Sequence, residues 1–120
     1  MPTNVLIVDD EFGLADIIAD LLRELGYDVE IAINGQLGLA SLHTRPADIV
    51  IADLMMPIMD GPDMIRRMRA DPALAATPIV LMTALPEGIP TDDSARVDAV
   101  LVKPFSIVEL LDVMKRLLRT

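Results

Sequence analysis

Short apolar runs, each followed by a polar residue, alternate along this chain with segments of helical periodicity. Residues 5–8 form the first run and precede Asp9 and Asp10, and residues 49–52 form the third and precede Asp53. Continuous apolarity over so few residues is typical of a strand covered on both faces, as in a parallel sheet. The segments between the runs are too short for anything but crossover connections.

Five such runs predict an α/β fold in which residues 1–120 form one domain with a doubly wound, five-stranded parallel sheet. The second run, 28–33, alternates apolar and polar residues and is therefore expected at an edge of the sheet. The fourth and fifth runs are 78–82 and 99–102. The expected strand order is 2-1-3-4-5, which places the first and third strands on either side of the switch in winding direction.

The helical segments between the runs predict which side chains face the core. In 12–25 the apolar spacing predicts one buried stripe, made of Leu14, Ile17, Ile18, Leu21, Leu22 and Leu25. A later helix is expected to start at Asp60, a residue type that caps helix N-termini. Its three arginines, Arg66, Arg67 and Arg69, are interpreted as a solvated face that complements the negative end of the helix dipole.

The segment 85–98 predicts an irregular connection. A crossover helix belongs here, but Pro86, Gly88 and Pro90 fall in its front half. Only 91–97 is able to form a turn or two. The fourth helix is therefore expected to be short or displaced.

Composition excludes several classes of function. The net charge is −9 and the pI is near 4.3, so the surface repels phosphate backbones and direct nucleic-acid binding by this domain is not expected. Three aromatic residues are too few for a base-stacking platform. The absence of cysteine excludes thiolate metal sites and cysteine nucleophiles. Charges, Pro or Gly interrupt every apolar run before it could span a membrane, so the default expectation is a cytoplasmic location.

The polar residues that follow the runs predict a binding site, because the carboxyl ends of parallel strands share one edge. Asp9, Asp10 and Asp53 would meet there and raise one another's pKa unless they share a cation. Oxygen ligands without His or Cys favour a hard ion such as Mg²⁺, or Mn²⁺. Each acid also has a simpler interpretation, helix capping for the first pair and a turn before Pro57 for Asp53.

The remaining polar residues at this edge suit a phosphoryl group bound beside the cation. Lys103 can contact it as a point charge, and the Thr83 hydroxyl can donate to another of its oxygens. Asp53 is the best candidate nucleophile because it stands alone at the end of a central strand.

The motifs Val8-Asp9-Asp10-Glu11, Asp53-Leu54-Met55-Met56-Pro57, Met82-Thr83-Ala84 and Lys103-Pro104-Phe105 resemble the receiver domain of two-component response regulators over the whole chain. The resemblance implies a flavodoxin-like fold, Asp53 as phosphoacceptor and a histidine kinase or phosphotransfer protein as donor. It implies Mg²⁺ held by Asp10, Asp53 and the Met55 carbonyl, with Asp9 acting through water, and phosphoryl contacts from Thr83 and Lys103. It also implies a cis bond between Lys103 and Pro104.

The chain departs from the family pattern in three places. Val100 stands where the family has an aromatic switch residue, so coupling to Thr83 cannot operate through a ring. The segment between Thr83 and Lys103 is about two residues shorter than usual, which puts dimerisation through that face in doubt. Met55 and Leu85 occupy variable positions near the site, and two apolar side chains there are expected to lengthen the phosphorylated lifetime.

Other functions remain open at this point. A phosphohydrolase of the haloacid-dehalogenase kind needs a second acid where Met55 stands, and a flavin phosphate would be repelled by Asp9 and Asp10. An unphosphorylated receiver that only binds proteins has the same sequence signature. The chain is expected to act as a signalling switch, and not as an enzyme beyond its own phosphorylation and dephosphorylation. Neither the kinase nor the downstream partner can be read from the sequence.

Overall fold

The five apolar runs form one parallel sheet. The computed structural model describes residues 2–118, apart from the side chains of residues 12 and 93. The strand order is β2-β1-β3-β4-β5, as predicted, and every neighbouring pair is parallel. Every residue of β3 and β4 is buried, including Asp53 and Thr83 at their ends, which explains why the runs that precede these two residues are apolar throughout. The strands are β1 (Asn4–Val8), β2 (Asp28–Ala32), β3 (Ile49–Asp53), β4 (Ile79–Thr83) and β5 (Ala99–Val102).

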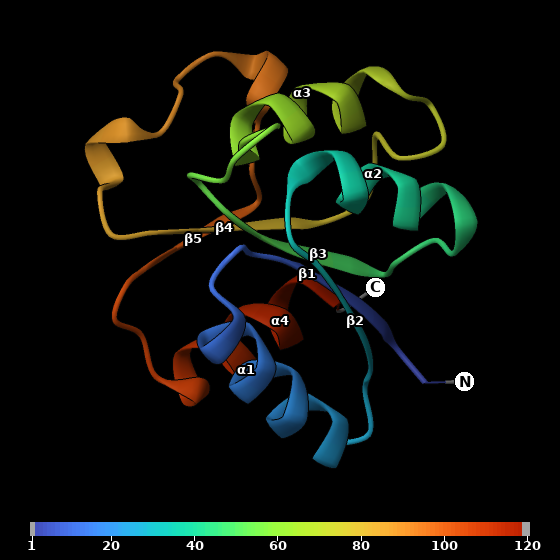
Figure 1. Ribbon diagram of the computed structural model, residues 1–120, viewed down its shortest axis with the longest axis vertical. Helices are drawn as coiled ribbons and strands as arrows, with labels where there is room; N and C mark the ends of the chain where they lie inside the picture. The colour runs from blue at the N-terminus through green and yellow to red at the C-terminus, as the bar shows by residue number, and fades with distance from the viewer. Residues whose placement is uncertain (1, 119–120) are drawn as a thin grey trace.

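Helices cover both faces of the sheet (Figure 1). One face carries α1 (Phe12–Glu24) and α4 (Ile107–Leu118), and the other carries α2 (Gly35–Thr44) and α3 (Gly61–Ala70). The chain therefore winds to one side after β1 and to the other after β2 and β3. This is the doubly wound architecture that the alternation of runs and helices predicts, and the flavodoxin-like fold that the resemblance implies.

The buried face of α1 differs from the predicted one. Ala15, Ile18, Ala19 and Leu22 are buried against the sheet, whereas Ile17, Leu21 and Leu25 are exposed, so half of the predicted stripe is wrong. The two alanines lie at helical spacing with Ile18 and Leu22, and their small side chains let the helix pack closely on the strands. Leucine is more hydrophobic than alanine, so the sequence pattern favours a buried face made of leucines over one that contains Ala15 and Ala19.

The connection from β4 to β5 contains no α-helix in the backbone of residues 84–98. It forms two 3₁₀ turns, η1 (Pro86–Gly88) and η2 (Asp93–Ala95). The predicted irregularity of this segment is confirmed, and η2 falls inside the range expected to form a turn. Its breakers prevent a continuous helix because proline removes a hydrogen-bond donor and clashes with the preceding turn.

The predicted solvated face of α3 is confirmed for Arg67 and for Arg66, whose side chain is 40% exposed, and is wrong for Arg69. Arg67 is exposed, but the side chain of Arg69 is only 8% exposed and pairs with Asp98 at 3.0 Å. Arg66 contacts Asp92 at 3.3 Å. Both partners lie in the β4–β5 connection, a long-range arrangement that helix periodicity does not encode. The predicted cap of α3 is confirmed, because Asp60 accepts a hydrogen bond from Asp63 N.

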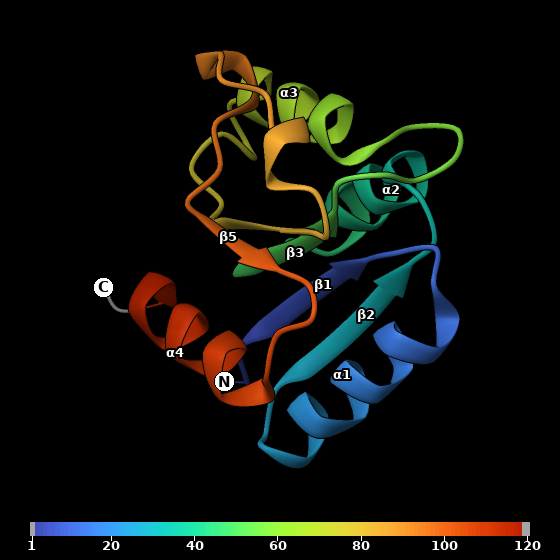
Figure 2. The ribbon, with the colours of Figure 1, turned by 90° about the vertical axis from the view of Figure 1, so that its left-hand side faces the viewer.

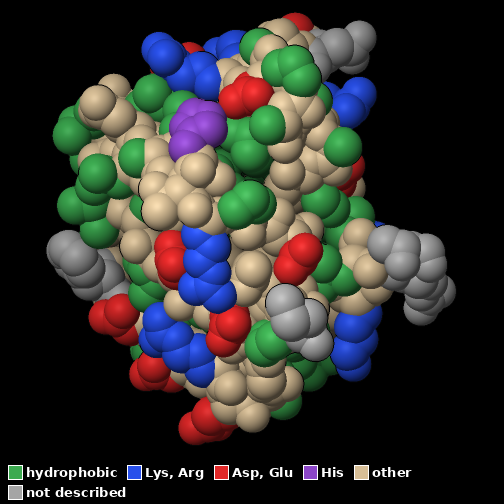
Figure 3. Space-filling model, turned by 90° about the vertical axis from the view of Figure 1, so that its right-hand side faces the viewer, with side chains coloured by type: hydrophobic (Ala, Val, Ile, Leu, Met, Phe, Trp, Pro, Cys, Tyr) green, Lys and Arg blue, Asp and Glu red, His purple; other side chains and the backbone are tan. Residues whose placement is uncertain are grey.

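The opposite end of the sheet, where the strands begin, is closed by ion pairs. Arg45, at the end of α2, contacts Asp28 at 3.0 Å and Glu30 at 3.1 Å, both on the edge strand β2. Figure 3 shows this end of the molecule, with basic and acidic side chains side by side. Charged side chains over an edge strand hinder pairing with another chain. Among the described residues, no helix is both long and apolar enough to span a bilayer.

Candidate functional site

Three aspartates meet where β1 and β3 end. The two strands are hydrogen-bonded neighbours in register, so Asp9 and Asp10, which follow β1, lie beside Asp53, the last residue of β3. One carboxylate oxygen from each lies within 4.8 Å of the others. Figure 2 shows this carboxyl edge of the sheet facing the viewer. The position is the switch point of the doubly wound sheet, because the connections after β1 and β3 go to opposite faces.

Asp9 is a buried acid with one unsatisfied oxygen. Its Oδ1 accepts a hydrogen bond from Glu11 N at 2.9 Å, but its buried Oδ2 has no hydrogen-bond partner among the described residues. Burial raises the pKa of Asp9 to about 6, and the nearby charge of Asp53 acts in the same direction, while the Glu11 N–H and Lys103 oppose it. A buried carboxylate oxygen without a donor is a position that a cation would stabilise.

Asp53 is held by its backbone surroundings. Its Oδ1 accepts from Leu54 N at 2.9 Å and lies 3.4 Å from Lys103 Nζ. Burial raises the pKa of this carboxyl, and the Lys103 ammonium counteracts the rise. The first residue of α3 is Gly61, and a Cβ at this position would collide with the Asp53 carbonyl oxygen. Only glycine allows α3 to begin so close to Asp53.

Lys103 faces the acids from the other side of the site. Its Nζ lies 3.4 Å from Asp53, 3.7 Å from Glu11 and 3.9 Å from Asp9, and its side chain is 16% exposed. The Lys103 N–H donates to Thr83 O at 2.8 Å, which ties the end of β5 to the end of β4. The expected cis peptide bond between Lys103 and Pro104 is present.

Thr83 completes the polar lining. It is buried at the end of β4, and its Oγ accepts a hydrogen bond from Leu85 N at 2.8 Å. Together with Asp53 and Lys103 it lines a hollow of about 300 Å³. Met55 and Leu85 line the same hollow, and both side chains are largely exposed.

The structure adds one residue to the site that the sequence predicts. Glu11 was not among the predicted site residues, yet it lines the hollow and pairs with Lys103. Its position directly after Asp9 and Asp10 was the available signal. Val100, expected at the switch position, lies in the middle of β5 beside Leu81. It is not among the residues that line the hollow.

The fold and the site define a class of α/β protein with a cluster of acids, a lysine and a threonine at the switch point of a 2-1-3-4-5 sheet. Comparison with known families shows which family of this class the chain belongs to. The family described as "Response regulator receiver domain" matches residues 5–115. The chain belongs to this family, as its motifs suggested.

Curated relatives are regulators about twice as long as this chain. A "DNA-binding dual master transcriptional regulator RpaA" from Synechocystis is 36% identical over 119 residues, covering 97% of this chain and 49% of the relative. "Sensory transduction protein RegX3" from Mycobacterium tuberculosis is 36% identical over 119 residues, covering 98% and 51%. The chain therefore spans about half the length of the curated relatives it matches.

Solved structures share the whole fold. The chemotaxis response regulator CheY4 of Vibrio cholerae is similar with a TM-score of 0.89 and 30% identity, covering 98% of this chain and 99% of that one. The receiver domain of the sensor histidine kinase PA1611 from Pseudomonas aeruginosa has a TM-score of 0.86 at 27% identity, covering 98% of both chains. That structure is described with a magnesium ion coordinated in the active site cleft.

Proposed function

We propose that this receiver domain is a signalling switch that accepts a phosphoryl group on Asp53 from a phosphohistidine donor. An oxygen of the Asp53 carboxylate attacks phosphorus, the P–N bond breaks, and the imidazole leaves with the electron pair, so that an acyl phosphate forms. The observation that carries the proposal is a buried carboxylate at the switch point with a lysine ammonium 3.4 Å away. The donor would be a histidine kinase or a phosphotransfer protein.

The residues around Asp53 suit a divalent cation, Mg²⁺ or Mn²⁺. Asp10 and Asp53 would bind it with the Met55 carbonyl, and Asp9 would act through water. The fit is supported by the buried Asp9 Oδ2, which has no hydrogen-bond partner among the described residues, and by the three oxygens within 4.8 Å of one another. Such an ion supplies charge neutralisation for the transferring phosphoryl group. Oxygen ligands of this kind select hard ions.

Lys103 and Thr83 would hold the phosphoryl group once it is on Asp53. The Lys103 ammonium already faces Asp53, and the Thr83 hydroxyl is the polar side chain at the end of the adjacent strand. A phosphoryl group adds roughly −1.5 to −2 charge within the hollow, which would draw both groups inward. Since Val100 is not aromatic, the movement of Thr83 would be transmitted to the segment that follows it without the help of an aromatic side chain at position 100.

The downstream partner would be a protein or an output domain whose binding changes with this charge. The relatives' additional length is consistent with an output domain in those proteins. The acidic surface of this domain argues against direct contact with nucleic acid, so any effect on DNA would pass through another domain or protein.

The proposal is tested by incubating the protein with acetyl phosphate and Mg²⁺ and measuring its intact mass. We expect an increase of one phosphoryl group that vanishes in Asp53→Ala and in EDTA. Asp16→Ala, which changes an exposed acid of α1, is the matched control and should be labelled like the wild type. An unlabelled wild-type protein would favour a receiver that acts only as a binding module.

A further inference from the structure

The β4–β5 connection is held against α3 by two arginine side chains. No α-helix forms in residues 84–98, so the connection lacks the continuous helical backbone that would support it. Arg66 and Arg69 leave α3 on the side of this connection and contact it at separate points. The two attachments differ greatly in burial and in the number of hydrogen bonds.

Arg69 is a buried anchor at the end of the connection. Its guanidinium donates to the carbonyl oxygens of Arg96, Ala75 and Thr77, each at 2.9 Å, and to Asp98 Oδ2 at 3.0 Å. The same Asp98 oxygen accepts from Ile79 N at 2.8 Å, at the start of β4. The Arg69 side chain is 8% exposed and the Asp98 side chain is 35% exposed, so the anchor depends mainly on the number of hydrogen bonds that the guanidinium donates. The end of the connection is therefore fixed.

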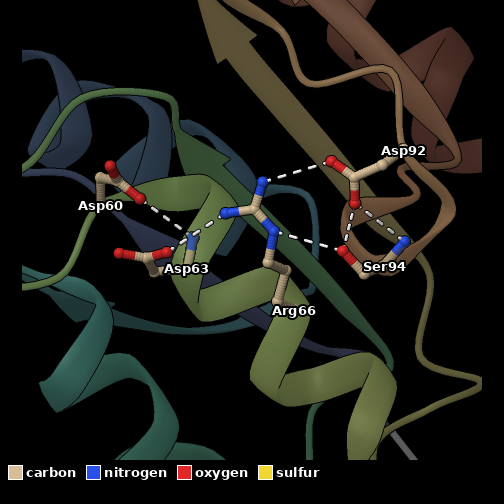
Figure 4. Close-up of polar contacts among 5 residues, drawn as sticks. All are labelled: Asp60, Asp63, Arg66, Asp92 and Ser94. Atoms are coloured by element: carbon tan, nitrogen blue, oxygen red, sulfur yellow. Dashed lines mark hydrogen bonds and ion pairs between the residues drawn. The ribbon is translucent and has the colours of Figure 1, made fainter.

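Arg66 is an exposed fastening in the middle of the connection. Its Nη2 donates to Asp92 Oδ2 and its Nε donates to Ser94 Oγ, each at 3.3 Å (Figure 4). The side chains of Arg66 and Asp92 are 40% and 52% exposed, and exposed pairs contribute little stability.

Two features make the Arg66 fastening reversible. Arg66 also pairs with Asp63 of its own helix at 3.2 Å, so it keeps a partner when the connection leaves. Asp92 Oδ1 accepts from both the N–H and the hydroxyl of Ser94, so the turn keeps its own hydrogen bonds. Release of Arg66 thus leaves no charged group without a partner.

The front of the connection starts at the candidate site. Thr83 Oγ, which faces the hollow, accepts the hydrogen bond from Leu85 N. Gly88 lies against Leu54, the neighbour of Asp53, since a Cβ at residue 88 would be 3.2 Å from Leu54 Cδ2. A rotation of the Thr83 hydroxyl toward a group on Asp53 would break the Leu85 hydrogen bond and disturb the first turn.

We propose that residues 84–95 are a strap that is fastened to α3 by the contacts of Arg66 with Asp92 and Ser94. The strap is anchored at its end by Arg69. Phosphorylation of Asp53 releases the Arg66 fastening while the Arg69 anchor holds. The coupling to Asp53 rests on the proposed function, whereas the fastening itself does not. Release uncovers Leu54, a buried core residue against which the strap packs at Gly88.

Hydrogen–deuterium exchange of the full chain, followed by mass spectrometry, tests the fastening without any phosphodonor. Arg66→Gln should speed exchange in peptides covering 84–95 by about 3- to 10-fold and leave 99–102 unchanged. Asp92→Asn removes the partner from the strap side and should have the same effect. Arg67→Gln, on the neighbouring exposed position of α3, is the matched control and should behave like the wild type. Equal exchange in the Arg66 and Arg67 variants would overturn the fastening.

A second arm uses wild-type protein treated with acetyl phosphate and Mg²⁺, with the intact mass measured on the same sample. Phosphorylated wild type should exchange in 84–95 as fast as unphosphorylated Arg66→Gln, and Arg66→Gln should gain little further. Phosphorylated protein with an unchanged strap would overturn the coupling while leaving the proposed function in place. A sample that gains no mass would refute the proposed function and the coupling together, and the variants would still decide the fastening.

Discussion

Replacing Asp9 with asparagine should stabilise the domain when divalent cations are absent. Asp9 is 1% exposed, and its Oδ2 has no hydrogen-bond partner among the described residues. In the folded chain its pKa is raised from 3.8 to about 6, chiefly by burial. At neutral pH the Asp9 carboxylate is ionised although burial destabilises its charged form, and this lowers the stability of the folded chain. Asparagine has a neutral amide and removes that charge.

The magnitude follows from the difference between the folded and unfolded pKa values. The unfolded chain loses the Asp9 proton first, so stability falls as pH rises from about 4 to about 6, and the full penalty remains above that range. A shift from 3.8 to about 6 corresponds to an upper limit of about 3 kcal/mol at pH 7.5, and to roughly half of that at pH 5. The interaction of Asp9 with Asp53 and Lys103 reduces the expected gain to about 1–3 kcal/mol.

Urea denaturation in EDTA, followed by circular dichroism at pH 7.5 and pH 5, measures this gain. Asp9→Asn should raise the free energy of unfolding at pH 7.5 and by less at pH 5, whereas Asp16→Asn on α1 should change neither value. Mg²⁺ should stabilise the wild type at pH 7.5 and stabilise Asp9→Asn less, because a ligand that binds only the folded state adds stability according to its affinity. A destabilised Asp9→Asn in EDTA, or a gain independent of pH, would refute the reasoning.

Three further changes test other parts of the structure. Met55→Asn should shorten the half-life of the phosphorylated protein, because a polar side chain at the hollow admits water. The half-life is measured by loss of the added mass after the phosphodonor is removed. An unchanged half-life would count against this role of Met55. Arg69→Gln should lower the free energy of unfolding by about 1–3 kcal/mol in urea denaturation, since it removes hydrogen bonds to the carbonyl oxygens of Arg96, Ala75 and Thr77. Arg67→Gln should stay within about 0.5 kcal/mol of the wild type. Gly61→Ala should destabilise the domain, because the new Cβ collides with the Asp53 carbonyl oxygen. Gly13→Ala in α1 is the control: its Cβ meets nothing within 4 Å, so the variant should be neutral or stabilised by up to about 1 kcal/mol. Equal thermal midpoints for the two alanine variants would contradict the packing of α3 against Asp53.

The sheet and the location of the site were predictable because they depend on local patterns and on one topological rule. Apolar runs of four or five residues specify strands, and the carboxyl ends of parallel strands share an edge. Asp53 could therefore be expected next to Asp9 although 43 residues separate them in the sequence. The irregular connection between β4 and β5 was predictable for the same reason, because Pro86 and Pro90 disrupt a helix within the segment that contains them.

Features that depend on tertiary packing were not predictable in the same way. The buried face of α1 cannot be predicted from apolar spacing alone, because Ala15 and Ala19 carry little hydrophobic signal although both are fully buried. The environment of Arg69 depends on Asp98, which lies in a different segment and reaches α3 only after folding. The contact of Glu11 with Lys103 is not predictable from local pattern, because it depends on where β5 ends.

The central claim is that Asp53, and not either of the acids beside it, carries the phosphoryl group. It is tested most directly by treating the protein with acetyl phosphate and Mg²⁺, reducing the acyl phosphate with borohydride, and locating the resulting homoserine by peptide mass spectrometry. We predict homoserine at position 53 alone, and none when Mg²⁺ is replaced by EDTA. Homoserine at position 9 or 10, or at no position in protein that remains folded, would contradict the claim.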